Sequence, residues 1–380
     1  MMKLSAMASL SPHPSSLSSS SSSSTATFFL RRSPFPHPNP PKLAPFADPS
    51  SFRFQARGIR RSICMSSSNV SPSSGIPGGG GESFLRKVLE RMESVYLSRN
   101  PTAKSVLDLV ASADDNPICY DHLAFRTFGV SGHGIGSIAR FFTDYGYTQM
   151  DELRFPAKKL RALWFSPPKD SAVSEDGSGV HGPLPRIFIS ELLVDQMSPQ
   201  TQEIIRRYVG ISGNGYEHAA LASAVGALTW GKPLRSEFQQ LAKESEYAAW
   251  TLVNGYAVNH VTISTHRLKS HLRDIKSLNQ FIEQNGFKLN SEGGALKVSP
   301  DGLLLQSSTV ADSFPFQFSD GATESVPCSY IEFAERLVLP EFRNLPTKEL
   351  EEFHRRDGFE VGNADKIFES TSKEQLTRRA

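Results

Sequence analysis

Cysteine is scarce in this chain, and long apolar runs are missing from it. Three cysteines occur in 380 residues, Cys64, Cys119 and Cys328, and none has the Cys-x-x-Cys spacing of zinc knuckles or redox motifs. An odd number of widely spaced cysteines does not indicate a disulfide framework, so a reducing compartment fits. No apolar stretch approaches the roughly 18 residues that a membrane helix needs. We therefore expect no membrane-spanning segment.

Acidic residues are nearly absent from residues 1–65, where Asp48 stands against eight Lys and Arg. The segment is also rich in serine and proline, a composition that cannot bury a core and is typical of a plastid transit peptide. Mitochondrial import and untargeted disorder are the alternatives. The serine and proline content, and the lack of an early amphipathic arginine helix, favour a plastid, either chloroplast stroma or amyloplast. Residues 66–81 predict a flexible linker.

An excess of basic residues is missing from the remainder of the chain. Residues 66–380 carry 33 Lys and Arg against 38 Asp and Glu, a net charge of −5. A nucleic-acid-binding protein usually presents the opposite balance. The charge therefore argues against a nucleic-acid partner.

Two parts of this remainder follow the same order of patterns. A strand-like run with one histidine is followed in each by a helical pattern that ends at glycine, and then by further strand-like runs. The corresponding segments are 120–128 and 258–265 for the first strand, 161–168 and 294–302 for an inner strand, and 186–193 and 329–337 for the last. A strand, a helix and then strands, occurring twice, predict a duplicated βαβββ module.

We therefore expect an α+β fold in which two such modules form one curved sheet around a metal site. The expected parts are a catalytic domain at 82–340, made of module one (117–197), a helical insert (198–256) and module two (257–340), and then a charged C-terminal extension at 341–380.

Strand alternation brings polar side chains to the inner face of this sheet. In the run 120–128, His122 and Arg126 point to one face while Leu123 and Phe125 point to the other, against the helix. By the same rule His260 faces inward from the corresponding strand of module two. The two histidines thus occupy equivalent interior positions.

Glu332 faces inward from the last strand of module two, together with Tyr330. A single buried histidine or glutamate is more often a hydrogen-bonded core residue than a ligand. Two imidazoles and one carboxylate that converge from a repeat instead form a facial triad, which holds Fe(II) and leaves positions open for O2. Glu191 and His218 are possible additional ligands, although structural roles are favoured for both.

Arg126 lies on the same strand face as His122. A guanidinium that points into a pocket beside a metal is suited to bidentate binding of a carboxylate. The alternative is an ion pair with an acidic side chain of the protein.

These residues resemble a known family. DHLAFRTF (121–128), AAWTLVNGYAVNHVTI (248–263) and YIEFAERL (330–337) resemble the 2-oxoadipate dioxygenase/decarboxylase family of the vicinal-oxygen-chelate superfamily, in particular its plastid-targeted plant branch of the floury-endosperm type. The resemblance implies Fe(2+) held by His122, His260 and Glu332. It also implies a substrate site that includes His122, Arg126 as the catalytic arginine, and Val361 in the stretch GFEVGNADKIF (358–368).

The reaction implied by the resemblance is the conversion of 2-oxoadipate and O2 to D-2-hydroxyglutarate and CO2, a step of lysine breakdown. A small 2-oxo dicarboxylic acid and O2 are the partners that it implies. Two alternatives remain open. One is another metal-dependent enzyme of the same fold, either a ring-cleaving dioxygenase or a glyoxalase-like isomerase that uses Glu191 as a fourth ligand. The other is a non-catalytic plastid factor in amyloplast or starch development.

Overall fold

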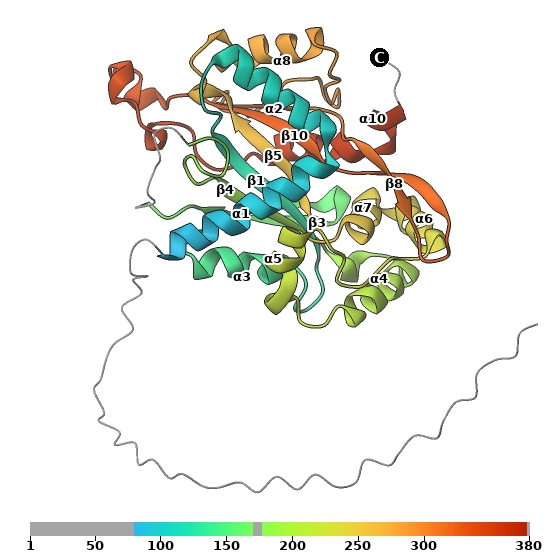
Figure 1. Cartoon of the computed structure of the whole chain (residues 1–380). Coiled ribbons are helices and arrows are strands. Elements are labelled where there is room, and N and C mark those ends of the chain that lie inside the picture. The colour runs from blue at the N-terminus through green and yellow to red at the C-terminus, as the bar shows by residue number, and fades with distance from the viewer. Residues whose placement is uncertain (1–79, 170–176, 378–380) are drawn as a thin grey trace, which may run out of the picture. The chain divides into compact units, whose positions relative to one another are not determined.

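Two consecutive helices open the part of the chain that the computed structural model describes, residues 80–169 and 177–377 (Figure 1). Helix α1 (Gly80–Arg99) buries Leu85, Leu89 and Met92 at the spacing of one helical face. Helix α2 (Pro101–Asp114) starts with a proline, which has no amide hydrogen to leave unpaired at that position. The predicted transit peptide (1–65) lies outside the described residues.

An eight-stranded mixed sheet forms the centre of the fold, in the order β2-β3-β4-β1-β5-β10-β7-β6. Its central strands are rich in β-branched and aromatic residues and are buried along almost their whole length. The strands are β1 (Tyr120–Phe128), β2 (Thr148–Phe155), β3 (Leu160–Ser166), β4 (Arg186–Leu192), β5 (Val258–Ser264), β6 (Lys297–Val298), β7 (Leu304–Ser308) and β10 (Tyr330–Arg336).

The two halves of this sheet have the same topology. β1 pairs in parallel with β4, and β5 pairs in parallel with β10. The two first strands, β1 and β5, pair with each other in antiparallel orientation at the centre. Helices α3 (Ile135–Asp144) and α8 (Ile275–Gln284) follow β1 and β5 at equivalent places. The predicted duplicated βαβββ module and its α+β class are therefore confirmed.

The second module differs from the first in its inner strands. The segment 294–302, predicted as strand-like, contains only the two-residue strand β6, because a turn at 299–302 follows it directly. A separate hairpin of β8 (Ser313–Gln317) and β9 (Thr323–Pro327) is inserted before β10. The predicted helical insert contains α4 (Pro199–Ile211), α5 (Gly215–Val225), α6 (Arg235–Glu244) and α7 (Glu246–Asn254).

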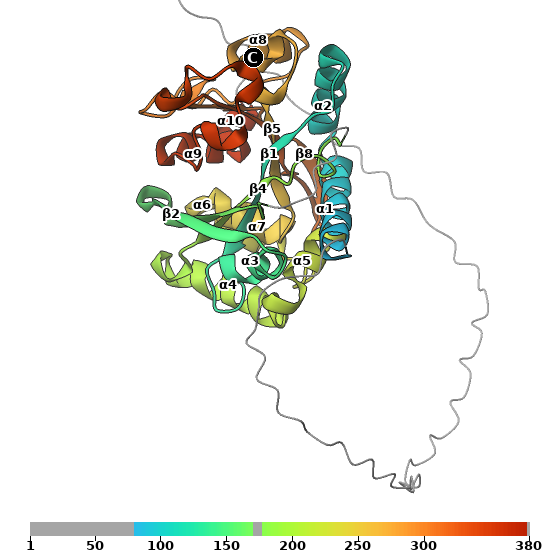
Figure 2. The same ribbon diagram turned by 90° about the vertical axis from the view of Figure 1, so that its left-hand side faces the viewer.

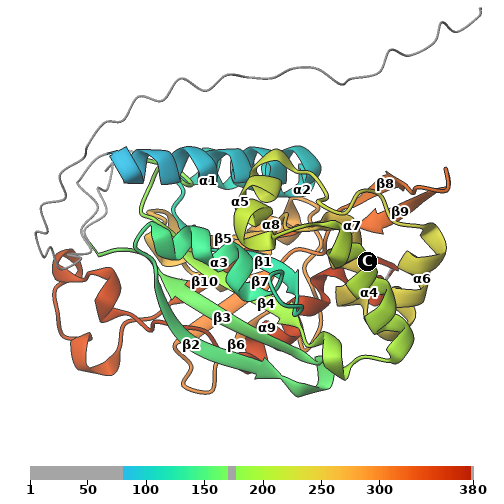
Figure 3. The ribbon, with the colours of Figure 1, turned by 90° about the horizontal axis from the view of Figure 1, so that it is seen from below.

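Helices lie on both sides of the central strands. Helices α1 and α2 lie on one side of β1 and β5, and the C-terminal helices α9 (Val361–Ile367) and α10 (Lys373–Thr377) lie on the other (Figures 2 and 3). The inner faces of both first strands are thus enclosed rather than open to solvent. Among the described residues, no helix has the length and apolar character required to span a membrane. Cys119 and Cys328 are free thiols, in agreement with the lack of a disulfide signal.

Candidate metal centre

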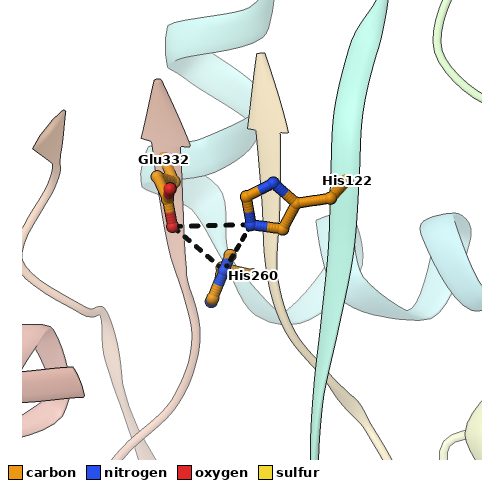
Figure 4. A group of neighbouring side chains, drawn as sticks. All are labelled: His122, His260 and Glu332. Carbon is orange, nitrogen blue, oxygen red and sulfur yellow. Dashed lines mark hydrogen bonds and ion pairs between the residues drawn. The ribbon is translucent and has the colours of Figure 1, made fainter. Parts of the chain in front are cut away.

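Three side chains that are far apart in sequence meet on the inner face of the sheet. His122 comes from β1, His260 from β5 and Glu332 from β10, and their ligand atoms all lie within 4.8 Å of one another (Figure 4). The two Nε2 atoms are 3.2 Å apart, and Glu332 Oε2 is 3.0 Å from His260 Nε2 and 3.8 Å from His122 Nε2. All three residues are buried. In the described part of the chain, this is the one cluster of histidine, cysteine and acidic residues with the spacing of a metal site.

Each histidine has a hydrogen-bond partner that fixes its ring. His122 Nδ1 is 2.8 Å from the carboxylate of Asp121, and His260 Nδ1 is 3.0 Å from the side-chain oxygen of Asn259. An acceptor at Nδ1 places the ring proton there and leaves Nε2 with a free lone pair that points into the cluster. The preceding residue therefore prepares each histidine as a ligand, at equivalent positions of the two modules.

The electrostatics of the cluster keep His260 and Glu332 in the protonation states that a cation requires. Burial lowers the pKa of His260 to about 4 despite the neighbouring carboxylate, so the ring is neutral near pH 7. Burial alone would raise the pKa of Glu332. The two histidines and the amide of Gln306, which donates to Glu332 Oε1 over 2.7 Å, outweigh that effect and lower the pKa. The cluster thus offers the neutral imidazole of His260 and the carboxylate of Glu332 beside the imidazole of His122.

Asp121 is part of a buried ion-pair network. Its carboxylate lies 2.6 Å from Arg336 Nε and 3.5 Å from Arg186, and its side chain is inaccessible to solvent. Burial would raise the pKa of Asp121, but the two guanidinium groups and the histidine hold it well below its usual value. The residue that orients His122 is therefore a fixed anion.

The fourth ligand position that the repeat offers is occupied by an apolar residue. His122 is paired with Arg186 across β1 and β4, as His260 is paired with Tyr330 across β5 and β10. Phe188 is two residues beyond Arg186, and Glu332 is two residues beyond Tyr330, so Phe188 is the equivalent of Glu332. Phe188 lines the cavity at the cluster and cannot bind a metal. Module one therefore contributes one ligand and module two contributes two.

Glu191 occupies the position of module one that corresponds to Glu335. Its carboxylate accepts the backbone amide of Ile135 over 2.8 Å at the start of α3, as that of Glu335 accepts the amide of Ile275 over 3.0 Å at the start of α8. A second oxygen of Glu191 pairs with Arg161. Both glutamates thus cap a helix, and the structure does not bring Glu191 to the metal centre.

His218 also lies outside the cluster. It belongs to α5 in the helical insert, where its Nε2 is 3.1 Å from the hydroxyl of Ser212. This contact supports the structural role that was favoured from the sequence.

C-terminal residues cover the cluster. Together with Phe188 and Tyr330, Phe359 and Phe368 line the cavity of about 20 Å³ beside the three ligands, and the ring of Phe359 lies 4.8 Å from that of His122. Both aromatics lie in the predicted charged extension, within the stretch 358–368 that the resemblance assigned to the substrate site. They occur in a loop and in a short 3-10 turn (Phe368–Thr371), so no regular apolar period distinguishes them.

Arg126 is 2% exposed and lies among aromatic rings rather than beside an acidic partner. Its guanidinium carbon is 5.0–5.6 Å from the rings of Trp250, Tyr247 and Phe368. One terminal nitrogen donates to Thr371 and the other to the carbonyl of Phe368. The internal ion pair that was the alternative interpretation is not found for it among the described residues.

Arg126 lines a second and larger cavity of about 260 Å³, together with Lys158, Lys159 and other residues. Phe368 borders both this cavity and the one at the metal ligands. The arginine and the triad are therefore neighbours that are separated, in this conformation, by the C-terminal segment.

Val361 is placed differently from the other predicted site residues. It is the first residue of α9 and is 39% exposed, and it is not among the described residues that line the cavity at the ligands. Ala364 and Ile367 of the same helix line that cavity instead. A contact between Val361 and a substrate stays a prediction.

The paired βαβββ modules define a vicinal-oxygen-chelate-like fold, and its inner face carries a cluster of two histidines and one carboxylate. The chain belongs to the 2-oxoadipate dioxygenase/decarboxylase family, whose model matches residues 88–352. The resemblance inferred from the sequence is thus confirmed.

Similar proteins are known from two plants. The chain is 71% identical over 319 residues to 2-oxoadipate dioxygenase/decarboxylase, chloroplastic, from Arabidopsis thaliana, covering 84% of this chain and 85% of that protein. It is 67% identical over 324 residues to 2-oxoadipate dioxygenase/decarboxylase, chloroplastic/amyloplastic, from Oryza sativa subsp. japonica. That match covers 84% of this chain and 88% of that protein. Both names agree with the plastid address that was predicted from residues 1–65.

A solved structure from Oryza sativa, hydroxyglutarate synthase in complex with 2-oxoadipate, resembles this chain with a TM-score of 0.78. The two sequences are 67% identical, and the alignment covers 83% of this chain and all of that one. The described fold is therefore that of a 2-oxoadipate-binding relative.

Proposed function

We propose that this protein is an Fe(II)-dependent enzyme that converts 2-oxoadipate and O2 to D-2-hydroxyglutarate and CO2 in the plastid, as a step of lysine breakdown. The proposal rests mainly on one observation. In a chain that belongs to this family, three buried side chains suited to binding a metal come together, and the position of module one that is equivalent to Glu332 is Phe188. The high identity to relatives that are named for this substrate supports the choice of acid.

The ligand set fits Fe(II). His122, His260 and Glu332 would hold the ion through two imidazole nitrogens and one carboxylate, the combination typical of non-haem iron oxygenases. When bound, Fe(II) would supply O2 activation and a Lewis acid for a chelating 2-oxo acid. The protein fixes the ligands before metal binding through Asp121 and Asn259, so little reorganisation is required.

The remaining roles belong to the protein's own side chains. Arg126 would bind a substrate carboxylate, because its guanidinium is buried and its Nε has no partner among the described residues. Phe188, Phe359 and Phe368 would exclude water from the reacting end of the substrate. The cavity of about 20 Å³ holds little more than one water molecule, so a six-carbon acid requires Phe368 or its segment to move.

A glyoxalase-like isomerase is less well supported. Such an enzyme would use a fourth protein ligand, whereas Glu191 caps α3 and Phe188 occupies the equivalent position. A ring-cleaving dioxygenase would require an acid or base near the metal. The buried arginine on β1 is better suited to a dicarboxylate than to a ring.

The test is oxygen uptake by the purified protein after anaerobic loading with Fe(II), with 2-oxoadipate, shorter 2-oxo dicarboxylates and pyruvate as substrates. We expect O2 consumption and CO2 release in equal amounts with 2-oxoadipate, and a chiral product with the D configuration. No turnover of any 2-oxo acid by iron-loaded protein would contradict the proposal.

A variant of one ligand tests the metal site separately. His260→Ala is expected to abolish stoichiometric iron binding and turnover, because two ligands hold Fe(II) weakly. Iron content after gel filtration is the measurement. His218→Ala is the matched control, since this histidine lies in the helical insert and should leave the iron content unchanged. Iron retained at wild-type level by His260→Ala would contradict the ligand assignment.

A further inference from the structure

Tyr330 lies between the metal ligands and Arg126. Its ring stacks on the ring of His260, with centroids 4.7 Å apart and an interplanar angle of 26°. It lines the cavity at the ligands, two residues before Glu332 on β10. The Arg126 guanidinium lies close to its hydroxyl from β1. Tyr330 therefore connects the two parts of the proposed active site.

Two buried polar atoms at this place have no partner other than each other. Apart from their mutual contact, neither the hydroxyl of Tyr330 nor Nε of Arg126 makes a hydrogen bond to the described residues. Both side chains are almost fully buried. A buried donor without an acceptor costs free energy in the folded protein, and an acceptor on a bound ligand would remove that cost.

Other hydrogen-bonding groups of the same residues are already used. The backbone carbonyl of Tyr330 accepts from Tyr96, and the two terminal nitrogens of Arg126 donate to Thr371 and Phe368. The first contact fixes the backbone of β10 at Tyr330, and the other two attach the Arg126 guanidinium to the C-terminal turn. The Tyr330 hydroxyl and Arg126 Nε are therefore the donors of these two residues that remain for a ligand.

We propose that Tyr330 is a specificity-determining residue: its hydroxyl and Arg126 Nε together bind the carboxylate of the substrate that is remote from the metal. This inference rests on the proposed function, since it assumes a 2-oxo acid whose other end is held at the triad. A carboxylate has two oxygens and matches two converging donors. A methyl group in its place would leave both donors buried and unpaired, which disfavours monocarboxylic 2-oxo acids.

The test compares two acids that differ only at the remote end. Binding of 2-oxoadipate and of 2-oxohexanoate to iron-loaded protein is measured anaerobically by calorimetry, for wild type and for Tyr330→Phe. The variant should bind 2-oxoadipate about 10- to 100-fold more weakly, because it lacks one hydrogen bond to a charged group. Its affinity for 2-oxohexanoate should stay within about threefold of wild type.

The matched control is Tyr147→Phe, which removes another buried hydroxyl, one that donates to the carbonyl of Pro185 in module one. It should lower the thermal unfolding midpoint without changing the preference between the two acids. Iron content and the unfolding midpoint of Tyr330→Phe show whether that variant is intact.

The outcomes separate the two proposals. Wild-type protein that binds no 2-oxo acid contradicts the proposed function itself. If wild-type protein prefers 2-oxoadipate and Tyr330→Phe keeps the same preference, the role of Tyr330 alone is overturned. The same holds if the variant binds both acids more weakly by an equal factor.

Discussion

At the scale of single residues, each side chain of the candidate metal cluster has a neighbour that sets its orientation. Asp121 and Asn259 accept from the two histidines at equivalent positions, and Gln306 donates to Glu332. The partners of the two histidines differ in charge, although their geometry is alike. The partner of His122 is an anion, and the partner of His260 is a neutral amide.

Gln306 provides a test of this orientation. We expect Gln306→Leu to weaken metal binding by about 10- to 100-fold, since Glu332 loses the donor that fixes its carboxylate. Anaerobic competition with a chromophoric chelator measures the affinity. Gln239→Leu is the control, because Gln239 also donates to a glutamate, Glu324, but in the partly exposed insert. Equal affinities in the two variants would show that the hydrogen bond to Glu332 has no effect on the metal.

The triad was predictable because two independent regularities agree at its residues. Strand alternation turns His122, His260 and Glu332 inward, and the repeat places the two histidines at equivalent positions. The aromatic surroundings of Arg126 were not predictable in the same way. They come from α7 and from the C-terminal turn, and no local pattern in the sequence links those segments to β1.

At the scale of elements, Glu191 on β4 and Glu335 on β10 each stabilise the helix of their own module. Glu191 caps the start of α3, and Glu335 caps the start of α8. The carboxylate of Glu191 approaches the start of α3 so closely that a side chain at Gly134 would collide with it. This contact explains the glycine that precedes α3. Glu191 is three residues beyond Phe188 on β4, and side chains alternate between the two faces of a strand. Its carboxylate therefore lies on the face of the sheet opposite to the candidate ligands.

Glu191→Gln separates a capping role from a ligand role. We expect unchanged iron content and a free energy of unfolding that is lower by about 0.5–2 kcal/mol, the usual cost of a weakened helix N-terminus. Urea unfolding and metal analysis are the measurements. Glu332→Gln serves as the comparison and should lose iron. Loss of iron from Glu191→Gln would instead support the four-ligand site of an isomerase.

The C-terminal element was predicted differently by composition and by resemblance. Its charge pattern suggested an extension beyond the catalytic domain, whereas the resemblance implied that 358–368 belongs to the substrate site. Phe359, Ile367 and Phe368 of this stretch line the cavity at the candidate ligands. Helix α9 has seven residues and is followed directly by a 3-10 turn, so its buried residues do not repeat at a single period. Contacts over such distances in sequence become visible only in the folded chain.

At the scale of the whole molecule, Glu352 joins the C-terminal part of the chain to both modules. Its carboxylate contacts Arg186 on β4 and both His266 and Arg267, which follow β5, at 3.0–3.2 Å. Burial raises the pKa of Glu352, but the hydrogen bond from His266 and the two arginine charges outweigh burial and hold the pKa well below its ordinary value.

This network predicts how stability depends on pH. A carboxylate with a depressed pKa stabilises the folded protein above its unfolded pKa of about 4.3, and this contribution is lost as the pH falls through the folded value. We expect Glu352→Gln to reduce the free energy of unfolding by about 1–2 kcal/mol at pH 7, allowing for partial exposure. The difference from wild type should shrink below pH 4. Urea unfolding at several pH values measures it.

The control for this prediction is Glu349→Gln, a change at an exposed glutamate of the same region. It should alter the free energy of unfolding by less than about 0.5 kcal/mol at every pH. A difference between wild type and Glu352→Gln that stays constant from pH 7 to pH 3 would contradict the predicted role of the charge.

The antiparallel seam between β1 and β5 has a consequence for the origin of the site. Two identical modules joined along this seam would present two histidines and two acids, related by a twofold axis, as a homodimer of single modules would. Fusion into one chain releases the copies from that symmetry, so one acid can be exchanged for Phe188 without the loss of the other. The unequal pair of Phe188 and Glu332 therefore requires two modules of different sequence, which a single chain provides.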